Sequence, residues 1–100
     1  MIKIESTTTP SNDREPLFSI DGREYTIPKE VPGNLALQAI ERMRVEHELA
    51  VVAWIMEQLL GKEGYRALLD CKAVTRKQLA QITEICRLKV MGDVEEEGKG

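Results

Sequence analysis

The sequence predicts a mainly α-helical fold with a small N-terminal β-hairpin, an α+β arrangement in which three to four helices form a small bundle packed on the hairpin. Three observations predict it. Residues 34–60 contain neither Gly nor Pro and are rich in Leu, Ala, Glu, Arg and Met, which favour helix. An Asp21-Gly22 dipeptide stands between two runs of β-prone residues. Two further segments with helical spacing of apolar residues follow Gly61.

Length and composition predict one small domain. One hundred residues leave no room for a second core, and only four aromatic side chains make that core small and aliphatic. A core of this size gives modest stability, which homo-oligomerisation or a partner would increase. A net charge of −3 gives no general reason to expect nucleic acid as a partner. No apolar run approaches the ~18 residues of a membrane-spanning helix, so we expect no membrane association.

Residues 1–16 are mostly small and polar, and we expect them to form a disordered tail. Pro10 and Pro16 remove two backbone donors, and the segment has little apolar surface to offset the entropy lost on ordering. Ile2 and Ile4 alternate with polar residues, which leaves a short strand open as the alternative. No apolar stretch typical of a signal peptide follows the first residue.

Residues 17–27 give the clearest local signal, a β-hairpin. Its Asp-Gly dipeptide suits the positive φ angles of a type I′ turn. A two-residue loop pairs Ile20 with Arg23 and Phe18 with Tyr25. An isolated hairpin is marginal in water, so we expect its apolar face to pack on the helices. That face comprises Phe18, Ile20, Tyr25 and Ile27.

The long stretch from Asn34 contains two apolar stripes that are out of phase. Ala36, Ile40 and Met43 form the first stripe, and Val51, Val52, Ile55 and Leu59 form the second. One ideal helix would place the two stripes on different faces and bring charged residues into line with the second. The sequence therefore predicts two helices, 34–46 with Asn34 as its N-cap and 48–60, with a break near 46–48.

Two shorter helices are predicted after Gly61, which is a natural C-cap. Residues 63–70 turn Tyr65, Leu68 and Leu69 inward. Residues 75–90 begin with a capping box, Thr75 with Gln78, and bury a stripe of Leu79, Ile82, Cys86 and Val90. We expect the domain to cover 17–91 and an acidic disordered tail to cover 92–100.

The sequence predicts no catalytic, metal or cofactor site. His47 is the one histidine, and a metal site needs more converging ligands, so a solvated or helix-boundary position is the favoured interpretation. Cys71 and Cys86 show neither CxxC spacing nor a secreted disulfide pattern, which favours reduced, buried thiols in a cytoplasm. We therefore do not expect an enzyme.

Trp54 supports two interpretations. It can pack in the core against the hairpin, or it can contribute with Met56 and Leu60 to a partner-binding groove, since Trp and Met are enriched at interfaces. A DNA-binding alternative rests on residues 74–89, which look like the opening helix of a helix-turn-helix. That motif requires a second, recognition helix, and here an acidic segment follows instead.

An ordered set of motifs over about residues 17–90 resembles the small tail assembly chaperones of long-tailed, siphovirus-type bacteriophages, most closely those of phages that infect actinobacteria. The set begins with a DG-x-x-Y-x-x-P hairpin and a Val-Pro that leads into Asn-Leu-Ala-Leu. It continues through Glu-Gln-Leu-Leu-Gly, Tyr-x-Ala-Leu and Thr-x-x-Gln-Leu-Ala-Gln-Ile. These motifs are at Asp21–Pro28, Val31–Leu37, Glu57–Gly61, Tyr65–Leu68 and Thr75–Ile82.

The resemblance implies a non-enzymatic chaperone in the cytoplasm of the infected host bacterium. Such proteins bind the tape measure protein, assist the tail tube protein in polymerising around it, and are not part of the mature virion. They are often made with a longer, frameshifted form, and the codons of Gly98-Lys99 can spell a slippery G-run followed by an A-run. A structural tail or head-completion protein is the third hypothesis, which its presence in purified virions would distinguish.

Overall fold

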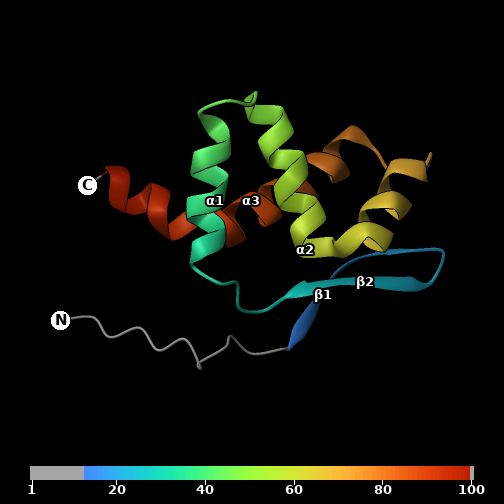
Figure 1. The fold of residues 1–100 in the computed structure, drawn as a ribbon. Helices are drawn as coiled ribbons and strands as arrows, with labels where there is room; N and C mark the ends of the chain where they lie inside the picture. Colours follow the sequence, from blue (N-terminus) through green and yellow to red (C-terminus); the bar gives the residue numbers. More distant parts are fainter. Residues whose placement is uncertain (1–12, 100) are drawn as a thin grey trace.

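The chain forms a two-stranded hairpin followed by three helices, which confirms the predicted α+β class (Figure 1). The computed structural model describes residues 13–99, with side chains described for 13–92. α1 and the first half of α2 stand side by side, the hairpin lies across the end away from their connecting loop, and α3 passes behind both (Figure 1). The elements are β1 (Arg14–Ile20), β2 (Arg23–Pro28), α1 (Asn34–Met43), α2 (Glu48–Asp70) and α3 (Arg76–Lys99).

The hairpin has the predicted turn and register. Asp21 and Gly22 have φ angles of 50° and 83°, as a type I′ turn requires. Phe18 lies opposite Tyr25, and their rings stack with centroids 5.2 Å apart. A register shift between Pro16 and Phe18 leaves Leu17 as an extra residue in β1.

β1 begins three residues earlier than predicted, at Arg14 rather than after Pro16. The reason is a long-range contact that sequence patterns do not reveal. The Arg14 guanidinium donates hydrogen bonds to the backbone carbonyls of Thr26 (2.7 Å) and Leu59 (3.0 Å). The remainder of the predicted tail, 1–12, lies outside the described residues.

The predicted break in 34–60 is present. α1 ends at Met43, α2 begins at Glu48, and His47 is the N-cap of α2. Its Nδ1 accepts a hydrogen bond from the backbone N–H of Leu49 at 3.0 Å, so His47 occupies a helix boundary. Asn34 as the cap of α1 was wrong.

The cap of α1 is Gly33, whose backbone is already helical at φ −60° and ψ −29°. The Leu35 N–H donates to the carbonyl of Pro32 at 3.0 Å, so the chain tightens into the helix one residue before Asn34. A side-chain cap at Asn34 would need an extended backbone there.

The predicted helices 48–60 and 63–70 are the two arms of α2, which is kinked at Gly61. This glycine has φ 79° and ψ 169°, a region essentially restricted to glycine. Inward packing of Leu69 was wrong, since that side chain is 60% exposed while Leu68 is buried. Adjacent helical residues point about 100° apart, and Leu68 occupies the inward direction.

α3 begins as predicted and ends later. The Thr75 N–H donates to Gln78 Oε1 (2.9 Å) and the Gln78 N–H donates to Thr75 Oγ1 (3.1 Å), which completes the capping box. Ile82, Cys86 and Val90 are buried as predicted, whereas Leu79, in the first turn of α3, is exposed, so its predicted burial was wrong.

The helix does not stop at Gly92 but continues to Lys99, through the segment that we expected to be disordered. Gly92 is not among the glycines with positive φ, and Glu95, Glu96 and Glu97 are good helix formers.

The core is aliphatic and lies where α2 meets β2 and α3. Its most completely buried side chains are Ile27, Val51, Ile55, Leu59 and Cys86. Burying an aliphatic side chain of this kind contributes about 1.5–3 kcal/mol. Among the described residues no buried side-chain N or O atom lacks a hydrogen-bond partner, so nothing polar in the core opposes this gain.

Candidate functional site

The three residues proposed to bind a partner do not share one surface. Met56 and Leu60 are buried in the core, and the Met56 sulfur accepts a contact from the Thr83 hydroxyl at 3.7 Å. Trp54 is only partly buried and lies beside α1. Trp54 is therefore the member of the set that an approaching partner can reach.

Trp54 lines a hollow of about 650 Å³, which we call the Trp54 groove. Most of its wall is one face of α1, because its members follow helical spacing into the turn after the helix. A face with this spacing presents a straight row of side chains beside the indole. The lining comprises Asn34, Leu37, Gln38, Glu41, Arg42, Val45, Glu46 and Trp54.

The charged groups of the groove are paired with one another. The Arg42 guanidinium lies 4.5 Å from the centroid of the Trp54 ring and 3.1 Å from a Glu46 carboxylate oxygen. Nε of Arg44, in the turn after α1, lies 3.6 Å from Oε1 of Glu41. These pairs are largely exposed, so each contributes at most about 1 kcal/mol to stability. Their main consequence is a nearly neutral rim around an apolar floor.

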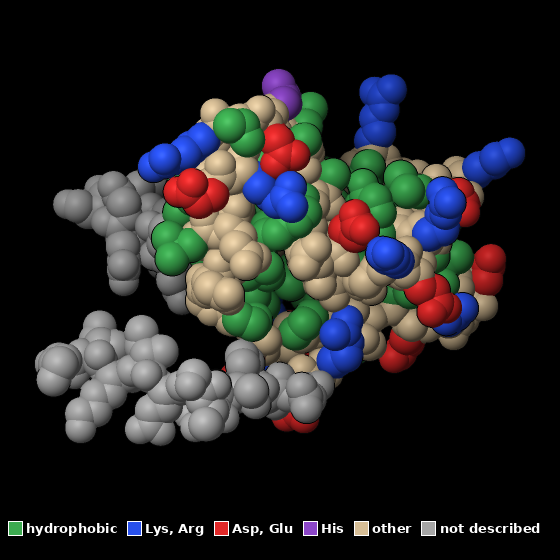
Figure 2. All heavy atoms as spheres, in the orientation of Figure 1, with side chains coloured by type: hydrophobic (Ala, Val, Ile, Leu, Met, Phe, Trp, Pro, Cys, Tyr) green, Lys and Arg blue, Asp and Glu red, His purple; other side chains and the backbone are tan. Residues whose placement is uncertain are grey.

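Large apolar side chains stay exposed on α1 and around the loop that joins it to α2. Leu37 is 65% exposed, Val45 85% and Leu49 72%. Figure 2 shows hydrophobic side chains on the face of α1 and the start of α2, interrupted by acidic and basic ones. Exposed apolar clusters with a polar surround are typical of binding surfaces.

Leu37 and Val45 were not predicted from the sequence to line a contact surface. For Leu37 a signal was present, because on a helix it points about 100° away from Ala36 and about 60° away from Ile40, outside the stripe that those two residues form. An apolar residue that leaves the buried stripe of a short helix points to a second contact surface.

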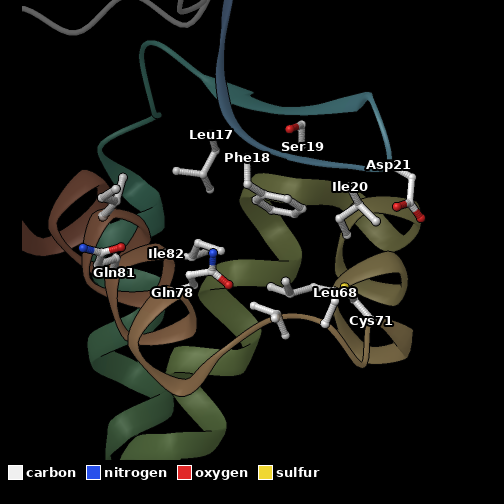
Figure 3. A pocket seen from close by; sticks show the side chains of 13 residues that line it. Leu17, Phe18, Ser19, Ile20, Asp21, Leu68, Cys71, Gln78, Gln81 and Ile82 are labelled. Carbon is white, nitrogen blue, oxygen red and sulfur yellow. The ribbon is translucent and has the colours of Figure 1, made fainter.

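A second hollow, of about 430 Å³, lies between β1 and the elements around the start of α3, and we call it the hairpin groove (Figure 3). Leu17, Phe18 and Ile20 of β1 point toward Leu68 and Ile82 on its floor. Its other lining residues are Ser19, Asp21, Cys71, Ala73, Val74, Gln78, Gln81 and Ile85.

The described residues contain no candidate metal centre. No cluster of three His, Cys, Asp or Glu side chains among them could hold a metal ion. Burial raises the pKa of the Cys86 thiol to about 11, so this thiol stays protonated at neutral pH. What the two hollows offer chemically is contact surface, partly apolar and partly polar.

Comparison with protein-family models, curated proteins and solved structures gives no match for this chain. The resemblance to tail assembly chaperones therefore stays a prediction. None of the helices in the part of the chain that the structure describes has the length and apolar character to cross a bilayer.

Proposed function

We propose that the protein is a tail assembly chaperone of a long-tailed bacteriophage, which binds α-helical segments of the tape measure protein in the Trp54 groove. The sequence motifs supply the family, and the exposed apolar face of α1 beside Trp54 is the observation that carries the binding mechanism. A tape measure protein is long and helical, so its chaperone needs a surface that docks amphipathic helices reversibly.

The dimensions of the groove suit a helix. Leu37 and Val45 are eight residues apart, which along a helix corresponds to roughly 12 Å, or about two turns. A partner helix with apolar residues at i, i+3 or i+4, and i+7 presents anchors over the same distance. Trp54 stands beside this row and adds an aromatic contact of the kind found at binding hot spots.

The neutral rim favours apolar recognition over charge recognition. Because Arg42 is engaged by Trp54 and Glu46, and Glu41 by Arg44, the groove presents little net charge to a ligand. Binding through apolar anchors depends weakly on salt, in contrast to binding of a polyanion.

The wider role follows from the family. The chaperone acts in the cytoplasm of the host bacterium, assists the tail tube protein in assembling on the tape measure protein, and is not retained in the virion. A longer frameshifted form and homo-oligomers belong to the same proposal. The DNA-binding alternative gains no support, because α3 continues as one helix to Lys99 where a helix-turn-helix needs a turn.

Co-expression with the tape-measure-like protein of the same genome tests this function. We expect the chain to copurify with that protein and to keep it soluble, and to be missing from purified virions. Recovery of the tape measure protein in soluble form at the same yield without the chain would refute the chaperone role. Detection of the chain in virions at stoichiometric amounts would support the structural alternative instead.

A further inference from the structure

The outer edge of β1 lies along the hairpin groove. Five consecutive residues line the groove, 17–21, which form the second half of β1 and the first position of its turn, whereas no residue of β2 lines it. Successive side chains of a strand point to opposite faces, so a run of consecutive lining residues places the groove beside the backbone of β1. Within the described residues the sheet consists of β1 and β2 alone, and this edge of β1 has no neighbouring strand there.

Ser19 presents both of its backbone hydrogen-bonding groups at this edge. Ile20 and Arg23 flank the two-residue turn, so they form a hydrogen-bonded pair. The alternation of an antiparallel ladder then turns the N–H and C=O of the next pair, Ser19 and Glu24, toward the two outer edges of the sheet. On the side of β1, Ser19 is therefore a template for an added strand.

The groove has a mixed polar and apolar lining that suits a polypeptide segment. Leu68 and Ile82 are buried on its floor and offer apolar contacts. Ser19, Gln78 and Gln81 add hydroxyl and amide groups to the lining, and all three residues are exposed. An extended peptide presents amide groups and side chains together, so it can use both kinds of surface.

The two ends of the groove restrict the segment that it can bind. Asp21, at the turn, is the one acidic residue of the described lining, which contains no Lys, Arg or His. This carboxylate favours a basic side chain nearby and disfavours an acidic one. At the other end Pro16 lacks an N–H, and the register shift before Phe18 interrupts the ladder. Regular pairing is therefore confined to a segment of about four residues opposite 18–21.

We propose that the hairpin groove binds a short extended segment of another protein, which adds antiparallel to the edge of β1 and has the pattern basic, apolar, any residue, apolar. The third residue of this pattern exchanges two hydrogen bonds with Ser19 and shares the exposed face of that side chain. The apolar residues on either side of it then turn toward Leu68 and Ile82. The basic residue lies at the level of Asp21, because the strands are antiparallel.

This strand-binding site goes beyond the proposed chaperone role and does not depend on it. The hairpin groove and the Trp54 groove share no lining residue, so one can be occupied or altered without the other. A bound segment also supplies a third strand to a sheet that is marginal with two. We therefore expect binding to raise the stability of the hairpin while leaving the Trp54 groove unchanged.

A labelled peptide tests the site on the full-length chain. Fluorescence anisotropy should show saturable binding of fluorescein-labelled Gly-Lys-Val-Thr-Val-Gly, and binding of Gly-Lys-Ser-Thr-Ser-Gly should be weaker by about tenfold or more, because its apolar contacts are lost. Asp21→Asn keeps a residue that suits the turn. This variant should reduce the preference for the Lys peptide over its Gln counterpart by roughly threefold.

Glu24→Gln is the matched control for charge. It removes the same charge from β2, outside the described lining, and should leave the preference for the Lys peptide unchanged. Absence of binding by the valine peptide, equal binding of the valine and serine peptides, or equal effects of Asp21→Asn and Glu24→Gln would each overturn the proposal.

Amide hydrogen exchange locates the bound strand. With saturating valine peptide, exchange of the Ser19 amide should slow by about tenfold, the gain expected for one net hydrogen bond. The Glu24 amide, which points to the other edge of the sheet, should exchange at an unchanged rate. Equal protection of both amides, or of neither, would overturn the proposal. Protection of Ser19 in the free chain would also overturn it, by assigning the edge to a second copy if the protection rises with protein concentration and to the same chain if it does not.

Discussion

The α2 side chains near the hairpin are buried, whereas apolar side chains beside the loop that joins α1 to α2 are exposed. Toward the hairpin, Ile55 and Leu59 are buried in the part of the core where α2 meets β2 and α3. Toward the loop, Val45 and Leu49 remain largely exposed. The two ends have similar composition, so composition does not decide which is buried. What decides it is whether another element of the chain crosses over, and nothing in the described structure crosses the loop end.

The largest loss of stability should come from truncating a buried side chain near the hairpin. Ile55→Ala removes a side chain that is only 1% exposed, and it should lower the free energy of unfolding by about 2–5 kcal/mol. Leu49→Ala, at 72% exposed, should change it by no more than about 0.5 kcal/mol. Urea denaturation followed by circular dichroism measures both, and equal losses would contradict the comparison.

Gly61 sets the angle between the two arms of α2 and should show the next largest effect. Gly61→Ala forces a side chain into a backbone conformation that only glycine adopts readily, which should cost about 1–3 kcal/mol. Gly33→Ala is the control, because Gly33 has a helical backbone and open space around it. It should leave the free energy of unfolding unchanged or raise it slightly.

The loop end depends on a local cap rather than on burial. His47→Ala removes the acceptor for the Leu49 N–H and should cost about 1 kcal/mol. His47→Asn keeps an acceptor at the N-cap and should cost much less. If the two substitutions are equally destabilising in thermal unfolding, the cap is not what defines the start of α2.

The two cysteines differ in burial, and this difference predicts a smaller, pH-dependent change in stability. The folded protein holds the Cys86 pKa at about 11, above the ordinary value of 9.0. Because the unfolded thiol ionises first, stability from this group is complete below pH 9 and is lost between pH 9 and 11. Cys86→Ala should reduce the loss of stability in that window. In the native protein, a thiol reagent should label Cys71 well before Cys86.

Local signals in the sequence predicted the positions of turns and helix starts better than they predicted which segments contact one another in the fold. The Asp-Gly turn and the Thr75 capping box each depend on residues within four positions of one another, and the break before Glu48 depends on two apolar stripes of one continuous stretch. Each of the three predictions was confirmed. The early start of β1 depends on a contact with Leu59, 45 residues away.

The candidate site depended on tertiary structure in the same way. Trp54, Met56 and Leu60 lie on one helix, and α3 covers the region of Met56, as its contact with Thr83 shows, but leaves Trp54 partly open. The sequence indicated Trp54 as a candidate contact residue, but it could not show that Leu37 of α1 and Val45 of the turn after it would be its neighbours.

Fluorescence of Trp54 tests the central claim most directly, since it is the only tryptophan in the chain. Titration with overlapping Trp-free peptides from the tape measure protein should give a saturable emission change for a peptide with helical apolar spacing. Leu37→Glu should weaken that binding by about tenfold or more. Leu69→Glu, at a similarly exposed leucine far from the groove, should bind like the unmodified chain. Equal weakening by both substitutions, or no response to any peptide, would contradict the account.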